Sequence, residues 1–133
     1  MPFPIDLKYI AESELQLGVQ FPDSFKNKMT QKNGGELITD DDAWQLFPFY
    51  DNSDTRRMSR TCNHIIQETK QSRSWNSFPI NGIAIAANAS GDNLILLPTD
   101  GNNKKLGEEI YLWRHETGEI KKIADTINEL TEG

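Results

Sequence analysis

The chain has 133 residues, 36% of them hydrophobic and 26% charged, so its length and composition are typical of one folded globular domain spanning residues 1–133. Twenty acidic against fourteen basic side chains give a net charge of −6, which disfavours direct binding to nucleic acid or to anionic lipid. The single cysteine excludes an internal disulfide. Because the sequence shows neither a signal peptide nor an apolar membrane span, we expect a cytoplasmic protein.

Two helices are expected at the start of the chain. The first spans residues 6–17 and ends at the glycine that follows them. Its apolar side chains that can share one side are Leu7, Ile10, Ala11 and Leu17. The second begins with the Phe-Pro-Asp-Ser sequence at 21–24, because proline is tolerated in a first helical turn and aspartate favours its positive end. Phe25 and Met29, four residues apart, face the core, and Asn-Gly-Gly at 33–35 ends this helix.

The next part of the chain is expected to form a hairpin and then a longer helix. Residues 36–39 and 43–47 are short extended segments around the turn-like acidic run at 40–42. Residues 54–70 form a surface helix, which Asp54 or the serine before it caps. The buried stripe of this helix contains Met58, Cys62, Ile65 and Ile66.

The second half of the chain is expected to form an antiparallel sheet. Turns rich in glycine, asparagine and aspartate separate four strands, at residues 83–87, 93–97, 109–114 and 119–124. Residues 100–103 resemble a polar hairpin turn. Thr126 and Glu129 have capping-box spacing, which predicts a short last helix. This order of elements predicts an α+β fold, in which a mainly antiparallel sheet is flanked by N-terminal, middle and C-terminal helices.

No pattern in the sequence points to catalysis, a cofactor or a metal. Cys62 and His64 are two residues apart in the expected helix, and side chains at that spacing point away from each other. The acidic run at 40–42 is followed by residues that supply no oxygen ligands at calcium-loop spacing. We therefore expect a protein that is not an enzyme, with no cofactor and no metal site.

A tryptophan side chain can lie either in the hydrophobic core or at a protein interface. Trp113 lies within an apolar strand and is expected in the core. Trp44 lies beside three aspartates, and two interpretations stay open for it. It is either a core residue or an aromatic anchor with an acidic rim, of the kind found at the centre of protein interfaces.

Six segments, in this order and spacing, carry a family resemblance: residues 17–25 (LGVQFPDSF), 33–35 (NGG), 44–48 (WQLFP), 83–86 (IAIA), 90–92 (SGD) and 110–119 (IYLWRHETGE). Together they resemble the SUKH superfamily, which contains bacterial toxin-immunity proteins and the related fungal cell-wall synthesis regulators. Phe21 and Phe25 stand where many relatives have leucine and tyrosine, and both keep an apolar side chain. The resemblance implies a non-enzymatic α+β domain. In many bacteria such a domain is an immunity protein that binds and blocks a polymorphic toxin, often a nuclease, delivered by a neighbouring cell.

The acidity of the chain suggests how such an immunity protein would bind. A nuclease needs a basic surface to hold phosphates, so an inhibitor that presents carboxylates can occupy that surface. The candidate partner-binding residues in predicted loops are Glu36, Asp40, Asp41, Asp42, Trp44, Asp51, Asp54, Asp92 and Glu108. The alternative is a protein-binding module of the cell-wall-regulator type, which has no toxin partner.

Overall fold

The computed structural model describes residues 3–39 and 42–132 of the chain. Helix α1 (Leu7–Leu17) begins where predicted, because the Asp6 carboxylate accepts a hydrogen bond from the Lys8 amide at 3.0 Å. The prediction for its buried face is right for Ile10, which is 1% exposed, and for Leu17, which packs against the core, but wrong for Leu7 and Ala11. Tyr9, Ile10 and Ser13 point inward, whereas Leu7 and Ala11 are exposed. Successive residues are about 100° apart around a helix, so when Ser13 faces inward, Ala11 lies on nearly the opposite side and Leu7 also points away from the core.

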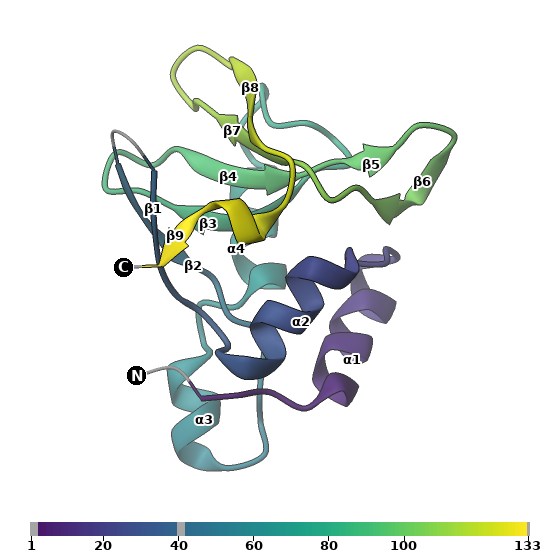
Figure 1. The fold of residues 1–133 in the computed structure, drawn as a ribbon, viewed down its shortest axis with the longest axis vertical. Helices are drawn as coiled ribbons and strands as arrows, with labels where there is room; N and C mark the ends of the chain where they lie inside the picture. The colour runs from purple at the N-terminus through teal and green to yellow at the C-terminus, as the bar shows by residue number, and fades with distance from the viewer. Residues whose placement is uncertain (1–2, 40–41, 133) are drawn as a thin grey trace.

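Helix α2 (Asp23–Gln31) also begins where predicted and packs against α1 (Figure 1). Phe25 and Met29 are completely buried, as expected. The helix ends shortly before the Asn-Gly-Gly sequence, where the Asn33 side chain is buried. Its amide nitrogen donates to the Phe49 carbonyl at 2.9 Å, and its amide oxygen accepts from the Phe49 amide at 2.8 Å. Asn33 therefore joins the exit of α2 to the segment that follows the first hairpin.

A curled antiparallel sheet forms the upper half of the molecule in Figure 1, with α1, α2 and α3 below it. Within the described residues the strand order is β8-β7-β4-β3-β2-β1-β9. The strands are β1 (Gly35–Ile38), β2 (Ala43–Leu46), β3 (Ile83–Ala87), β4 (Asn93–Leu96), β7 (Ile110–Trp113), β8 (Ile120–Ala124) and β9 (Thr131–Glu132). The first hairpin and the four strands of the second half are confirmed. A small separate hairpin, β5 (Pro98–Thr99) with β6 (Asn102–Leu106), contains the predicted polar turn, although Asn102 and Asn103 already belong to β6.

The single helix predicted for residues 54–70 is wrong. The structure has two short helices there, α3 (Thr55–Arg60) and α4 (Ile65–Ser72). Asp54 caps α3 as predicted, since its carboxylate accepts from the Arg57 amide at 2.7 Å. The helix stops at Thr61, whose hydroxyl donates to the Arg57 carbonyl at 2.9 Å and accepts from the Asp51 amide at 3.0 Å. This hydroxyl ties the end of α3 to the preceding loop.

Helix α4 has its own start signal at His64. The His64 Nδ1 atom accepts a hydrogen bond from the Gln67 amide at 3.3 Å. Burial, followed by the positive charge of Lys70, lowers the pKa of His64, which favours the neutral ring that this cap requires. The break between the helices divides the predicted stripe: Ile65 and Ile66 are buried, while Met58 and Cys62 are exposed.

The helices and the sheet share one core. Helix α4 packs on β3, where the completely buried Thr69 hydroxyl accepts from the Ala84 amide at 3.0 Å. The predicted last helix is a single 3-10 turn, η1 (Ile127–Glu129), which lies against α2. Beyond it, Glu132 on β9 pairs with Lys28 on α2 at 2.6 Å. Within the described part of the chain, no helix is long and apolar enough to cross a membrane.

Candidate functional site

Three turns of the sheet lie at one end, which we call the turn end. The first turn follows β1, and the structure describes its residues Thr39 and Asp42. The second turn is residues 88–92 between β3 and β4, and the third is residues 114–119 between β7 and β8. They share this end because neighbouring strands are antiparallel, so β1, β3 and β7 all run towards it. Asn93 lies opposite Trp113 in the register, which places the second and third turns side by side.

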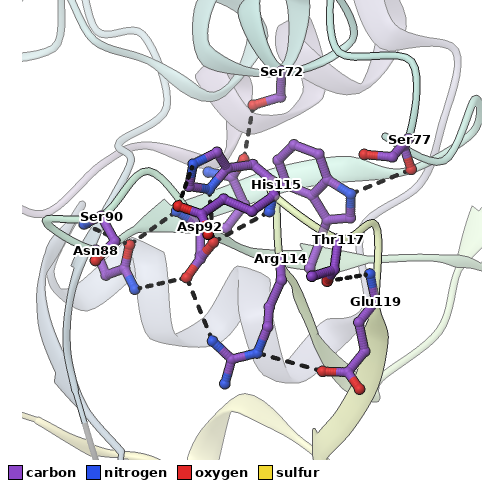
Figure 2. Close-up of polar contacts among 12 residues, drawn as sticks. Ser72, Ser77, Asn88, Ser90, Asp92, Arg114, His115, Thr117 and Glu119 are labelled. Carbon is purple, nitrogen blue, oxygen red and sulfur yellow. Dashed lines mark hydrogen bonds and ion pairs between the residues drawn. The ribbon is translucent and has the colours of Figure 1, made fainter.

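Asp92 is the centre of the polar contacts at the turn end (Figure 2). The residue is buried, and its Oδ1 atom accepts from the His115 amide at 3.2 Å and lies 2.8 Å from His115 Nδ1. An ionised carboxylate can only accept, so Nδ1 carries the proton in this pair. Two separate hydrogen bonds thus join the turn before β4 to the turn after β7.

Arg114 extends this cluster to the surface. One of its terminal nitrogens lies 3.7 Å from Asp92 Oδ2, and its Nε lies 3.4 Å from Glu119 Oε1. Figure 2 shows the guanidinium between the two carboxylates. Burial alone would raise the pKa of Asp92, but hydrogen bonds from His115 and Asn88 and the attraction of His115 outweigh it and lower the pKa. Asp92 is therefore a stable anion inside a polar cluster.

Asn88 connects the acidic positions of two turns. Its side-chain nitrogen donates to Asp42 Oδ2 at 2.6 Å and to Asp92 Oδ2 at 3.3 Å. Its side-chain oxygen accepts from the amides of Ser90 at 3.0 Å and Asp92 at 2.9 Å, which shapes the second turn. Asp42 and Asp92, both candidates from the sequence, are thus held by one amide side chain.

A loop from outside the sheet covers the side of the turn end near His115. The Trp75 ring meets the His115 ring edge-on, with 5.2 Å between the ring centres. The Trp113 indole N–H donates to the Ser77 carbonyl at 3.2 Å, and the Phe78 ring packs edge-on against Trp113 at 5.0 Å. Residues 75–78 are thereby fixed against the third turn.

A groove of about 440 Å³ opens beside the turn end. Ile38 and Thr131 line it from one end of the sheet, and Lys121 and Ile123 line it from the other. Residues from both outer parts of the sheet meet in this groove because the sheet is curled. Arg114 belongs both to the groove lining and to the cluster around Asp92.

The candidate acidic residues do not form one continuous surface. Asp42 and Asp92 meet at the turn end, and Asp92 is buried there. Asp51 is buried beside α3, and Asp54 caps that helix. Two others lie elsewhere: Glu36 is exposed on β1, and Glu108 accepts from the Ser24 amide in α2 at 3.4 Å. Asp40 and Asp41 lie outside the described residues.

Trp44 is a core residue, which decides between its two interpretations. Its side chain is 1% exposed, and its indole N–H donates to the Thr39 hydroxyl at 3.0 Å. A ring with no exposed face cannot insert into a partner, so the prediction of Trp44 as a partner-binding anchor is wrong. The exposed tryptophan is Trp75, which the sequence interpretation did not select. The sequence did contain a signal for this exposure, because Trp75 lies between serines and an asparagine. A tryptophan in a polar loop has no apolar neighbours in sequence to bury it.

The chemistry of the turn end is that of a rigid polar surface. Asp92 and His115 form an acid–imidazole pair, but in the described part of the chain no serine or cysteine side chain hydrogen-bonds to that imidazole. Among residues 3–39 and 42–132, no three histidine, cysteine, aspartate or glutamate side chains are grouped to hold a metal ion. What the arrangement offers is fixed hydrogen-bonding groups and carboxylates at the rim of three turns.

Comparison with protein families gives a match that covers nearly the whole chain. No curated protein and no solved structure matches significantly. The SMI1 / KNR4 family (SUKH-1) matches residues 4–133. The match spans all six segments that carry the resemblance in the sequence, and the α+β architecture agrees with the fold that the resemblance implies. On this evidence the chain belongs to the SMI1 / KNR4 family, SUKH-1.

Proposed function

We propose that this protein is an immunity protein that binds a cognate polymorphic toxin and neutralises it, and that the toxin is a basic nuclease domain. The observation that carries the proposal is membership of the SUKH-1 family over residues 4–133, because proteins of this family are non-catalytic immunity and regulatory proteins. We propose further that the chain acts as one domain in the bacterial cytoplasm, where a toxin from a competing neighbour would arrive.

The turn end is the surface where we propose that the toxin binds. It exposes the carboxylates of Asp42, Glu116 and Glu119 on turns that are locked together through Asn88 and His115. Carboxylates on a rigid frame can face the basic surface of a nuclease at little cost in conformational entropy. The net charge of −6 would also speed the encounter with a basic partner, particularly at low salt.

The proposal is tested by finding the partner and measuring its toxicity. The full chain is used as bait in extracts of its own organism, and the captured protein is identified. The gene of that protein is then expressed with and without the chain, and cell survival is counted. We expect the partner alone to kill cells and the chain to restore growth. A captured partner that is harmless and takes part in cell-wall regulation would overturn the proposal in favour of the regulatory alternative.

A matched pair of charge-reversal variants tests the place of binding. The double variant D41K/D42K reverses the charge of Asp42 at the turn end and of the residue before it in the sequence, and E12K/D100K reverses two exposed charges elsewhere. Both change the net charge equally, so steering by net charge is the same in each. We expect only D41K/D42K to lower the affinity for the captured toxin and the salt dependence of that affinity. Equal losses in both variants would show that the turn end has no special part in binding.

A further inference from the structure

Trp75 differs from the other two tryptophans in its exposure. Trp44 and Trp113 are each 1% exposed, whereas Trp75 is 51% exposed. Tryptophan is the residue most often found at energetic centres of protein interfaces, because it buries a large apolar surface with few rotatable bonds. A half-exposed tryptophan on a loop that is fixed to the sheet is therefore the residue to examine for a partner contact.

The surroundings of Trp75 hold it in place before any partner arrives. Its amide donates to the Ser72 carbonyl at 3.0 Å, and its carbonyl accepts from the Phe78 amide at 3.1 Å. Its ring rests edge-on against His115, and His115 is itself fixed by Asp92. An interface residue that is already ordered loses little conformational entropy on binding. Trp75 thus has the rigidity that a contact residue needs.

The third turn, which Trp75 contacts through His115, and the start of β8 expose an acidic and an apolar side chain. Glu116 has an 83% exposed side chain, and its Oε1 lies 3.9 Å from His115 Nε2, next to the ring that Trp75 contacts. Ile120 is 41% exposed and lies opposite Trp113 in the register, so its side chain is on the same face of the sheet as Trp113. The loop of Trp75 and the strand and turn that it packs against therefore expose an aromatic ring, a carboxylate and an aliphatic side chain: Trp75, Glu116 and Ile120.

We infer that the surface formed by Trp75, Glu116 and Ile120 is the central contact with the partner protein, and that it receives an arginine or lysine side chain flanked by an apolar residue. A cation can stack on the indole face while the Glu116 carboxylate pairs with it, and this combination fits a basic partner. The apolar neighbour of that cation packs on Ile120. The inference rests on the proposed function for the identity of the partner, but its chemistry can be tested without that partner.

The first test uses the captured toxin and three variants of the full chain. Trp75→Ala is expected to weaken binding by about tenfold or more, as substitutions at interface centres do. Trp75→Phe keeps an aromatic face and is expected to lose less. Leu15→Ala removes an 85% exposed side chain on α1 and serves as the matched control, which should bind like the unchanged protein. Thermal melting of each variant separates a lost contact from a lost fold. Full affinity of a folded Trp75→Ala variant would overturn the inference.

The second test needs no toxin. The isotope-labelled chain is titrated with a hexa-arginine peptide and, in parallel, with hexa-citrulline, which has the same shape without charge. We expect hexa-arginine to shift the Trp75 indole N–H and the Glu116 amide signals in NMR spectra, to leave the Trp44 and Trp113 indole signals in place, and hexa-citrulline to shift none of them. Shifts spread over acidic positions without Trp75 would overturn the inference and indicate charge attraction alone.

The two proposals fail in different ways. If the chain relieves toxicity but the Trp75→Ala variant relieves it equally and binds equally, the toxin is neutralised through another surface. If no toxic partner exists and hexa-arginine still shifts Trp75 and Glu116, the surface remains a binding site for cations and the immunity role is wrong.

Discussion

Asp92 is the residue on which the turn end depends most. It is buried and accepts hydrogen bonds from the amide and ring of His115 and from Asn88. We predict that Asp92→Asn lowers the free energy of unfolding by about 1–3 kcal/mol, because an amide nitrogen in place of a carboxylate oxygen leaves buried donors without an acceptor. Urea denaturation measures this loss. Glu119→Gln, which removes an exposed ion pair with Arg114, is the control and should cost no more than about 0.5 kcal/mol.

The same residue gives a prediction for acid pH. The pKa of Asp92 is lower in the folded chain than in the unfolded chain, where it is about 3.9. The ionised carboxylate therefore stabilises the fold at pH values above the unfolded pKa. This contribution is lost as the pH falls through the folded pKa. The difference in stability between the unchanged protein and Asp92→Asn should therefore be constant near neutral pH and shrink below about pH 4. A difference that stays constant down to pH 2 would contradict this assignment.

At the scale of elements, the third turn of the sheet is fitted closely to the loop before β3. Gly118 has a φ angle of 78°, and a Cβ atom there would lie 2.9 Å from the Cβ of Ser77. We predict that Gly118→Ala is destabilising by about 1–3 kcal/mol, from a left-handed backbone and from this close contact. Gly101→Ala is the matched control, since Gly101 has a φ of 81° and open space around it. If thermal or urea unfolding gave equal losses for the two variants, the contact with Ser77 would be unimportant.

Element positions could be predicted from the sequence where one local signal dominates. The first hairpin, β3, β4, β7, β8, α1 and α2 follow from apolar runs, proline and glycine, and they lie where expected, whereas β5, β6 and β9 were not predicted. The break between α3 and α4 could not be predicted, because it depends on the Thr61 hydroxyl reaching the Asp51 amide and on His64 acting as a cap. The inward face of α1 was predicted only in part, since Leu7 and Tyr9 are equally suitable for burial by composition and only packing decides between them.

The candidate site was predicted only in its separate parts. Asp42 and Asp92 were selected as acidic loop residues, but nothing local to either one shows that Asn88 holds both. Asp92 and His115 are 23 residues apart in sequence, and only the pairing of β4 with β7 brings them together. Trp75 was missed because it lies outside any periodic segment, where patterns of helices and strands give no information.

At the scale of the whole molecule, stability is expected to be unevenly distributed. All four residues of β4 and four of the five in β3 are buried, whereas α3 has no buried residue. We predict that in native-state hydrogen exchange the amides of β3 and β4 exchange only through global unfolding. Those of α3 should exchange through local opening at a much lower free energy. NMR-detected exchange in low concentrations of denaturant would show the difference. Equal protection of α3 and β4 would indicate a single cooperative unit.

The pairing of β9 with β1 has a consequence for the way the protein is made. Residues 131–132 complete the edge beside Leu37 and Ile38, and Lys28 contacts Glu132 across 104 positions of sequence. During synthesis on the ribosome, α2 and the first hairpin emerge long before the segment that covers them. Contacts between such distant parts of a chain form late and slow the folding of a domain. The edge of β1 is therefore exposed during translation, and aggregation at that stage is a risk that the finished molecule does not show.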